Sequence, residues 1–195
     1  MRVGRLLGGV ALAAGAAVIG HAAIRTTDGA EVDRELFGLV NRGHGDTADS
    51  VFGGVTEMGS IVAPLAASGV LAVAGHRRAA AHGVTAAGVS WLVLQGVKRL
   101  VLRPRPGDAS PAATRLMIAR PKASSWPSSH PAILTTFSRV AARELGVGRG
   151  GRLVLTGLDL AVAYSRVYVG VHYPSDVASG LLLGRAIARW WPRTG

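Results

Sequence analysis

The chain has 195 residues, of which 49% are hydrophobic and 17% charged, and its net charge is +11. This length fits a single domain over residues 1–195, since no long polar linker divides it. The basic residues are scattered between apolar blocks and form no recognisable nucleic-acid module, which argues against a nucleic-acid partner. The sequence has no cysteine, which excludes disulfides and thiolate metal sites.

Three apolar blocks without Lys, Arg, Asp or Glu cover residues 6–24, 58–75 and 79–97. About 20 apolar residues in a helix span the hydrocarbon core of a bilayer. The first block follows Arg2 and Arg5 and could instead be a cleaved secretory signal. It is longer than the roughly 7–15 residues typical of a signal's apolar region, so we expect an uncleaved first span.

Three weaker apolar segments follow at residues 131–147, 152–168 and 174–191. They carry internal charges, among them Arg139 and Asp159, which could pair or line a cavity. Together the six segments predict an all-α fold, a transmembrane bundle of six spans.

Charge in the connecting regions indicates an orientation for this bundle. Region 25–57 is the most polar part of the chain and is expected to be a water-facing loop. With six spans, both termini share one side with the loops at Arg77 and Arg149, which are basic and nearly free of acid, as on a cytoplasmic face. Lys and Arg are equally frequent on the two sides, so their number alone does not decide the orientation. The assignment requires that the basic residues of loop 98–122 serve a purpose other than setting the topology. We expect cytoplasmic termini.

The first motif is "KRLVLRPRP", which places Lys98 and Arg105 seven residues apart, with Pro106 directly behind. Lys binds phosphate as a point charge and Arg as a bidentate fork. The alternative is a solvated basic cluster at the end of a span.

The second motif is "WPSSHP", residues 126–131. Pro131 fits the first position of a helix, which would make His130 or Ser129 the cap. The free N–H groups and the dipole of that helix would form an anion site. The alternative is an ordinary serine-rich cap with an interfacial tryptophan.

The third motif contains Ser165, Arg166, His172 and Asp176. Pro174 again fits a first helical position, so Asp176 falls in the first turn, four residues after His172. A carboxylate there could hold one ring nitrogen and leave the other free, which suits a nucleophile or a base. The alternative is a capping aspartate beside a satisfied interfacial histidine.

Six spans would bring the three motifs to the same face of the membrane. Two histidines, one carboxylate and at least three cations at a common site suit phosphate chemistry without a metal. Each motif is weak alone, whereas three motifs in order with fixed spacing are specific.

These motifs resemble the type 2 phosphatidic acid phosphatase family, which includes lipid phosphatases, class A acid phosphatases and vanadium haloperoxidases. The matching residues are Lys98, Arg105 and Pro106; Pro127, Ser128, Ser129 and His130; and Ser165, Arg166, His172 and Asp176. One position departs, because Ser129 stands where the family has glycine. Serine keeps the backbone N–H that the family uses towards phosphate, but it adds a side chain.

The resemblance implies phosphoryl transfer through a phosphohistidine. His172 would be the nucleophile oriented by Asp176, and His130 the acid and base. Phosphate would be bound by Lys98, Arg105, Arg166, Ser128 and the N–H of Ser129, with Ser165 supporting the loop. No metal and no cofactor are implied.

The membrane setting suggests a lipid phosphate as substrate, with the active site on the extracytoplasmic side. The candidates are polyprenyl pyrophosphate, slightly favoured by the resemblance, phosphatidic acid, phosphatidylglycerol phosphate and a polyprenyl phosphosugar. Two other readings stay open, a secreted soluble acid phosphatase with the same site and a non-catalytic membrane protein that binds anionic lipid.

Overall fold

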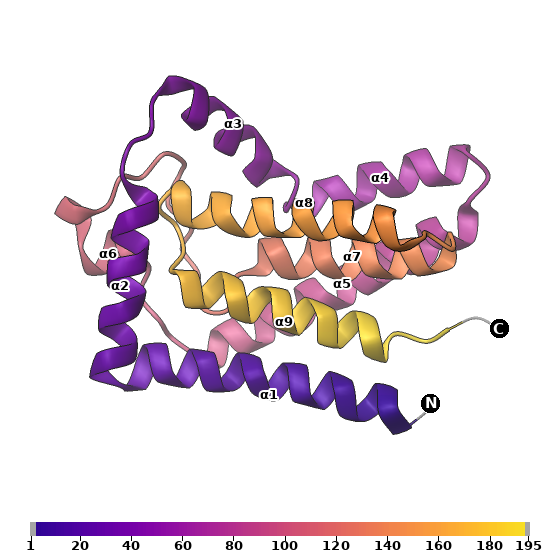
Figure 1. Cartoon of the computed structure of the whole chain (residues 1–195), viewed down its shortest axis with the longest axis horizontal. Coiled ribbons are helices and arrows are strands. Elements are labelled where there is room, and N and C mark those ends of the chain that lie inside the picture. Colours follow the sequence, from indigo (N-terminus) through magenta and orange to yellow (C-terminus); the bar gives the residue numbers. More distant parts are fainter. Residues whose placement is uncertain (1–2, 194–195) are drawn as a thin grey trace.

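The computed structural model describes residues 3–193, and its regular elements there are all helical, as predicted. In chain order they are α1 (Val3–Arg25), α2 (Thr27–Asn41), α3 (Asp46–Glu57), α4 (Val62–Val73), α5 (Arg77–Leu100), α6 (Pro106–Ala109), the 3-10 turn η1 (Pro111–Ala113), α7 (Ser129–Glu144), α8 (Arg149–Tyr168) and α9 (Pro174–Trp190). The long helices run roughly along one axis (Figure 1).

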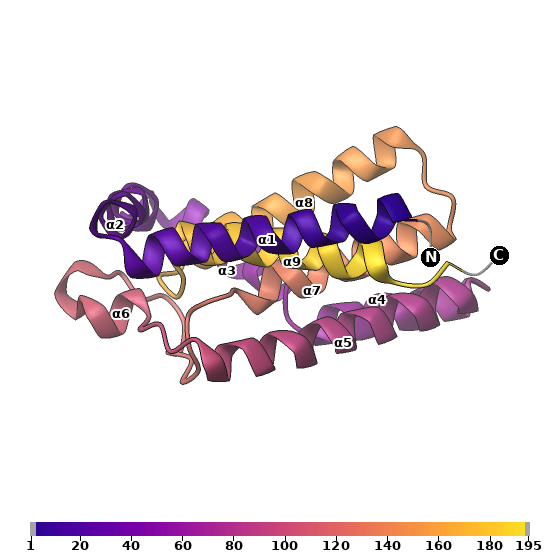
Figure 2. The same ribbon diagram turned by 90° about the horizontal axis from the view of Figure 1, so that it is seen from below.

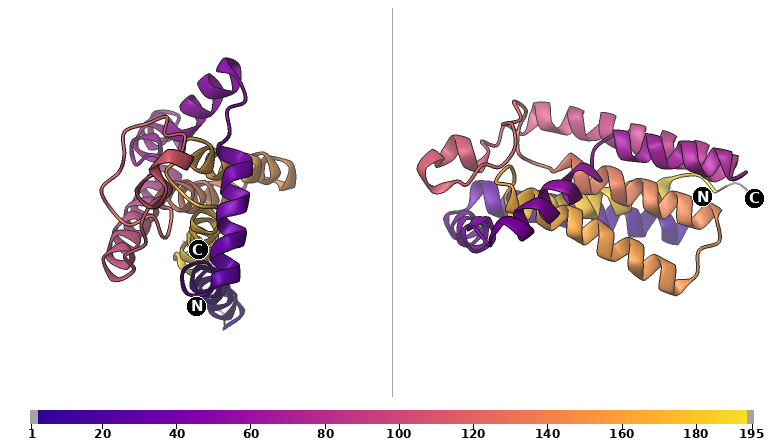
Figure 3. Two further views of the ribbon diagram at one scale, coloured as in Figure 1. Left: turned by 90° about the vertical axis from the view of Figure 1, so that its left-hand side faces the viewer. Right: turned by 90° about the horizontal axis from the view of Figure 1, so that it is seen from above.

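Helices α7 and α9 form the centre of the bundle and pack against each other. Helix α1 covers α9, α5 covers α7, and α4 lies beside α5 (Figure 2). Both described chain ends lie at one end of the bundle. At the other end, α2 and the segment around α6 lie over the ends of the central helices (Figure 3).

Two glycines on α9 allow α7 to approach closely. A Cβ at Gly180 would lie 2.4 Å from the carbonyl oxygen of Ser128, and one at Gly184 would lie 2.6 Å from that of Ala132. Small residues spaced by four let helix backbones pack together. This contact fixes the start of α9 against the start of α7, and these are the segments that carry the second and third motifs.

Five of the predicted segments form helices close to the expected bounds, namely α1, α5, α7, α8 and α9. Pro174 is the first residue of α9, and Asp176 lies in its first turn, as predicted. The predicted cap of α7 was wrong. That helix begins at Ser129 with Ser128 as its N-cap, so Pro131 is the third helical residue. The first turn of a helix tolerates proline because its N–H groups have no intrahelical partner.

Region 25–57 is not the loop that its charge suggested, because it forms α2 and α3. Both helices are amphipathic, and α2 buries Phe37 and Asp33 against the bundle. A high charge content therefore concealed a helical periodicity with one buried face.

The predicted span at residues 58–75 is interrupted. Its helix, α4, has only 12 residues, about 18 Å, which is too short for the ~30 Å hydrocarbon core. Helix α3 precedes it across a bend of 67°. Gly59 lies at this bend, where a Cβ would be 2.7 Å from the Cβ of His130. The chain therefore bends where it passes the second motif.

Length and hydropathy identify α1 as the one helix within residues 3–193 that could cross a membrane by itself, and α3 and α4 meet the same criterion only as a bent pair. Helices α7, α8 and α9 carry charges in their interiors, as the sequence indicated, whereas the charges of α5 lie at its two ends. The number of spans therefore stays a prediction.

Candidate active site

A cavity of about 350 Å³ lies where the three motifs meet. Six of the predicted site residues line it: Lys98, Arg105, Ser129, His130, Arg166 and His172. They come from the end of α5, the loop after it, the start of α7, the end of α8 and the turn before α9. Asp176, Ser128 and Ser165 lie behind this lining. The fold thus brings together residues that are up to 74 positions apart in the sequence.

His172 is held between a carboxylate and a guanidinium. Its Nδ1 lies 3.4 Å from Oδ2 of Asp176, and its Nε2 lies 3.2 Å from Nη1 of Arg105. Arginine can only donate hydrogen bonds, so Nε2 must accept and carries no proton. The ring proton is then on Nδ1, which donates to Asp176. In this tautomer the Nε2 lone pair accepts from Arg105, so the nitrogen that could attack lies beside a cation of the cavity.

The surroundings of His172 keep its imidazole neutral. Burial lowers its pKa well below the usual 6.5, and the positive charges of Arg105, Lys98 and Arg166 lower it further. A neutral imidazole has a free lone pair, which a nucleophile requires. His172 therefore stays in its reactive form at neutral pH.

The three cations of the cavity are anchored by uncharged oxygens. Lys98 donates to the carbonyl of Ser124 at 2.6 Å, Arg105 donates to the carbonyl of Val171 at 2.7 Å, and Arg166 donates to the hydroxyl of Thr56 at 2.7 Å. None of the three forms an ion pair with a carboxylate in the described part of the chain. Their side chains are almost wholly buried, and burial lowers the pKa of Lys98 to about 7. An anion that enters the cavity would pair with the two arginines and favour the protonated form of Lys98.

The serines of the motifs have different surroundings. Ser129, the residue in the place of the family glycine, lines the cavity, and its buried Oγ has no hydrogen-bond partner among the described residues. The backbone N–H of Ser128 donates to the carbonyl of Asp176 at 3.0 Å. Ser165 donates to the carbonyl of Val162, one turn earlier in α8, at 2.7 Å. Ser128 and Ser165 therefore connect or shape the elements that carry the cavity lining.

Arg103, which the sequence did not single out, holds Asp176 in place, and Asp33 holds Arg103. Arg103 donates from one nitrogen to Asp176 and from the other to Asp33, each at 2.6 Å, and its guanidinium stacks 4.3 Å from the ring centre of Tyr173. Burial alone would lower the pKa of Arg103, but the carboxylates of Asp176 and Asp33 outweigh it and raise the pKa. Arg103 is therefore a positioning residue for the carboxylate that orients His172.

Replacing Arg103 with lysine is expected to reduce turnover. Lysine keeps the positive charge but lacks the planar fork that reaches two carboxylates at once. Asp176 would then lose part of its fixed orientation, and a misplacement of about 1 Å at a reacting group can cost roughly 10²-fold in rate. We expect kcat for phosphate release to fall by about that factor, with little change in KM.

Arg99→Lys is the matched control for this variant, because Arg99 belongs to the same basic stretch but is exposed. It should behave as the wild type. An Arg103→Lys variant with wild-type kcat would show that Arg103 does not position Asp176 for the reaction.

Comparison with known proteins places this geometry in a family. Residues 78–194 match the model of the PAP2 superfamily. This match covers more than half of the chain and includes all three motifs, so the chain belongs to the PAP2 superfamily.

Relatives of known name support the same grouping. The decaprenylphosphoryl-5-phosphoribose phosphatase of Mycobacterium tuberculosis is 36% identical over 129 residues, which are 63% of this chain and 65% of the relative. The undecaprenyl-diphosphatase of Sulfolobus acidocaldarius is 40% identical over 77 residues, 38% of this chain and 35% of that protein. The chain thus spans just under two thirds of the length of the mycobacterial relative.

Two solved structures share the fold. The transmembrane PAP2-type phosphatidylglycerolphosphate phosphatase of Bacillus subtilis has a TM-score of 0.74 at 22% identity and covers 92% of this chain and 91% of its own. LpxE of Aquifex aeolicus has a TM-score of 0.71 at 23% identity and covers 79% of this chain and 90% of its own. The bundle therefore has the fold of these transmembrane PAP2 phosphatases.

Proposed function

We propose that this protein is a metal-independent membrane phosphatase that hydrolyses a lipid phosphate or pyrophosphate through a phosphohistidine intermediate. The observation that carries the proposal is the meeting of a neutral His172 with three unneutralised cations in one cavity. Phosphoryl transfer needs exactly these two elements, a positioned nucleophile and fixed positive charge around the equatorial oxygens.

In the first step, Nε2 of His172 attacks phosphorus and the bond from phosphorus to the leaving oxygen breaks. Lys98, Arg105 and Arg166 balance the charge on the phosphoryl oxygens, and the N–H of Ser129 adds a donor. Before the substrate binds, burial and the three cations lower the pKa of His130 to about 3. The phosphate offsets this charge, so His130 takes up a proton with the substrate and donates it to the departing oxygen. A lipid monophosphate releases its alcohol in this step, and a lipid pyrophosphate releases the lipid monophosphate. In both cases a phosphoryl group remains on His172.

In the second step, water attacks the phosphoryl group, and His130 accepts a proton from the attacking water. The bond between Nε2 and phosphorus breaks, and inorganic phosphate leaves. Asp176 holds the proton on Nδ1 throughout, and the ion pair with Arg103 holds Asp176. The enzyme returns to its starting protonation state without any external oxidant, metal or cofactor.

A polyprenyl-linked substrate is the candidate that the relatives favour. One relative is named for decaprenylphosphoryl-5-phosphoribose and another for undecaprenyl diphosphate. Both of these compounds carry a polyprenyl chain. The cavity lining also includes the apolar residues Ile61, Trp91 and Ile133. Trp91 is 40% exposed, so apolar surface leads from the phosphate site to the outside of the bundle. A lipid chain leaving the site would lie along this surface.

A phosphate-release panel tests the proposed function. The purified protein in detergent is given undecaprenyl pyrophosphate, a polyprenyl phosphosugar phosphate, phosphatidic acid and phosphatidylglycerol phosphate, each with and without EDTA. We expect the fastest release from one of the two polyprenyl substrates, and no loss with EDTA. Strict loss with EDTA that a divalent metal restores would contradict the metal-free reaction. No release from any of the four would favour the non-catalytic alternative.

The proposed topology has cytoplasmic termini, six spans and an extracytoplasmic active site. The chain has no native cysteine, so single cysteines report on topology directly. A cysteine at Arg77 should be protected from an impermeant thiol reagent in intact cells, and one at the exposed Asp108 should react. The reverse pattern would place the active site in the cytoplasm. Recovery of the protein in the soluble fraction without detergent would favour the secreted acid phosphatase.

A further inference from the structure

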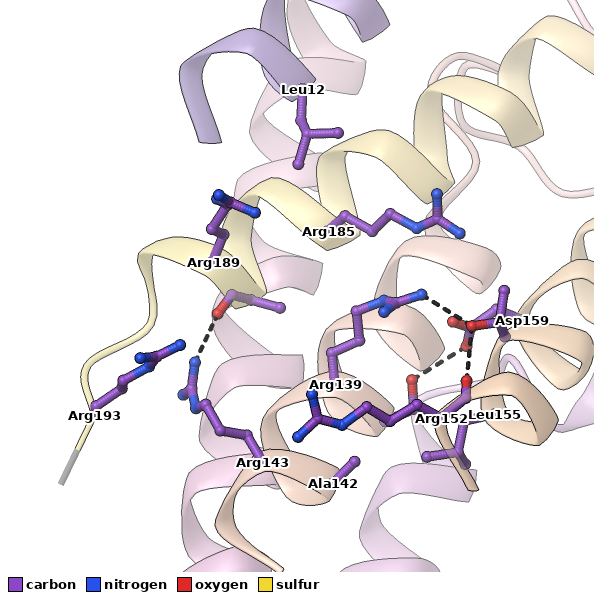
Figure 4. A pocket seen from close by; sticks show the side chains of 13 residues that line it. Leu12, Arg139, Ala142, Arg143, Arg152, Leu155, Asp159, Arg185, Arg189 and Arg193 are labelled. Carbon is purple, nitrogen blue, oxygen red and sulfur yellow. Dashed lines mark hydrogen bonds between the residues drawn. The ribbon is translucent and has the colours of Figure 1, made fainter. Parts of the chain in front are cut away.

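A second, larger cavity lies towards the end of the bundle where the termini are found, away from the three motifs (Figure 4). Its volume is about 550 Å³, and residues of α1, α7, α8 and α9 line it. We call it the arginine pocket after the six arginines in its lining: Arg139, Arg143, Arg152, Arg185, Arg189 and Arg193. The lining contains one acidic residue, Asp159. No motif of the catalytic site reaches it.

The positive charge of the arginine pocket is largely uncompensated. Asp159 is fully buried, and its Oδ1 accepts from Ser138 at 3.2 Å rather than from an arginine. Arg139 donates to the hydroxyl of Thr156, and Arg143 donates to the carbonyl of Ala188. These two partners are neutral, so they satisfy N–H groups without cancelling charge. Arg143 also forms an ion pair with Glu144, whose Oε1 lies 4.0 Å from its Nε.

Two donors in the pocket still have no partner among the described residues. The Nε groups of Arg139 and Arg185 are buried and form no hydrogen bond with any described residue. The side chain of Arg185 makes no hydrogen bond with any residue of 3–193. Buried donors on cations are costly unless they are paired. Several guanidinium groups converging on one cavity, with donors left over, form a binding site for an anion with several acceptor oxygens, such as a phosphate group.

An apolar groove adjoins the arginine pocket. The groove has a volume of about 770 Å³ and lies between α4, α7 and α8, with Leu71 and Phe137 among its lining residues. Ser138, Ala142 and Leu155 line both cavities. These shared residues belong to α7 and α8, two helices that diverge towards the loop that joins them (Figure 2). A ligand with an anionic head and an apolar chain would fit this arrangement.

We propose that the arginine pocket binds the phosphate of an anionic phospholipid, whose acyl chain lies in the adjoining groove. The lipid is a bound component and not a substrate, because the pocket contains neither catalytic histidine. A basic pocket between the membrane helices of a protein is a known setting for anionic head groups. Under the proposed topology the lipid would come from the cytoplasmic leaflet. The site is independent of the phosphatase reaction, so either proposal can fail alone.

Lipid retention by the purified protein tests the site. The full chain in detergent is incubated with phosphatidylglycerol, phosphatidylcholine or inorganic phosphate, and binding is followed by native mass spectrometry. Phosphatidylglycerol is a phosphodiester and has no terminal phosphate for the catalytic site to release. We expect wild-type protein to bind phosphatidylglycerol in preference to phosphatidylcholine. Arg185→Gln should weaken this binding about tenfold, because it removes one charged hydrogen-bonding partner.

Arg139→Gln/Arg185→Gln is the stronger variant and should weaken binding about a hundredfold. If it does not fold, Arg185→Gln still decides the question, since this change removes no hydrogen bond. Arg77→Gln/Arg78→Gln is the control, because it removes the same charge from exposed positions at the same end of the bundle. It should bind as the wild type does, and phosphate release should be unchanged in all variants.

The proposal would be overturned if Arg185→Gln bound phosphatidylglycerol as well as the wild type does. It would also be overturned if the Arg77→Gln/Arg78→Gln control weakened binding as much as Arg185→Gln, or if the wild type did not prefer phosphatidylglycerol to phosphatidylcholine. A response to inorganic phosphate that Arg185→Gln abolishes, without any lipid binding, would also overturn the lipid as occupant and leave a site for free phosphate.

Discussion

His172→Ala is expected to abolish phosphate release. The variant lacks the nitrogen that attacks phosphorus, while the three cations of the cavity still bind the phosphate. Loss of a nucleophile in a coupled catalytic unit typically costs several orders of magnitude, and we expect at least a loss of about 10⁴-fold in kcat. KM should change much less, because Lys98, Arg105 and Arg166 remain.

The fold must survive this change for the result to be informative. His172 is buried, so alanine leaves a small cavity beside Asp176. His172→Asn is therefore the companion variant, because its amide keeps a donor towards Asp176 and fills part of the space. His76→Ala, at an exposed position, is the matched control and should have full activity. Membrane insertion and elution in detergent should be the same in all three. Turnover at the wild-type rate in either His172 variant would contradict the nucleophile assignment.

His130→Ala is expected to slow both chemical steps. Removing a general acid and base costs about 10²–10⁴-fold, and the loss is largest when the leaving group is a poor one. A lipid alcohol needs the proton, whereas p-nitrophenolate leaves without it. With p-nitrophenyl phosphate, we therefore expect His130→Ala to release one equivalent of p-nitrophenol rapidly and then turn over slowly. The slow phase is hydrolysis of the phosphoryl enzyme, which still lacks its base.

The contrast between substrates makes this variant decisive. With the lipid substrate no burst is expected, because the first step is itself slow without the acid. Equal losses for both substrates, with no burst for the aryl phosphate, would show that His130 does not protonate the leaving group. The measurement is a stopped-flow trace compared with a steady-state assay of phosphate.

The local parts of the candidate site could be predicted from the sequence. Pro174 fixes where α9 begins, and the spacing from His172 to Asp176 then places the carboxylate in the first turn beside the ring. The meeting of the three motifs followed from their order along a bundle of antiparallel helices. These inferences depend on short-range geometry or on simple topology, which the sequence states directly.

The missed features depend on contacts between distant segments. Arg103 and Asp33 are 70 positions apart, and no local pattern indicates that they share Asp176 as a neighbour. Asp33 also lies in the region that was expected to be a loop because of its charge. The bend at Gly59 was hidden for a related reason, since Gly59 packs against Val162 and His130, which are both distant in the sequence.

A direct search for the phosphoryl enzyme tests the central proposal most closely. The wild type, His130→Ala and His172→Asn are quenched during reaction with a substrate labelled in its transferable phosphate. We expect label that is stable to base and labile to acid, strongest in His130→Ala, on the tryptic peptide 167–185, where His172 is the only histidine. Label that survives acid, or label of equal strength in His172→Asn, would contradict a phosphohistidine at this position.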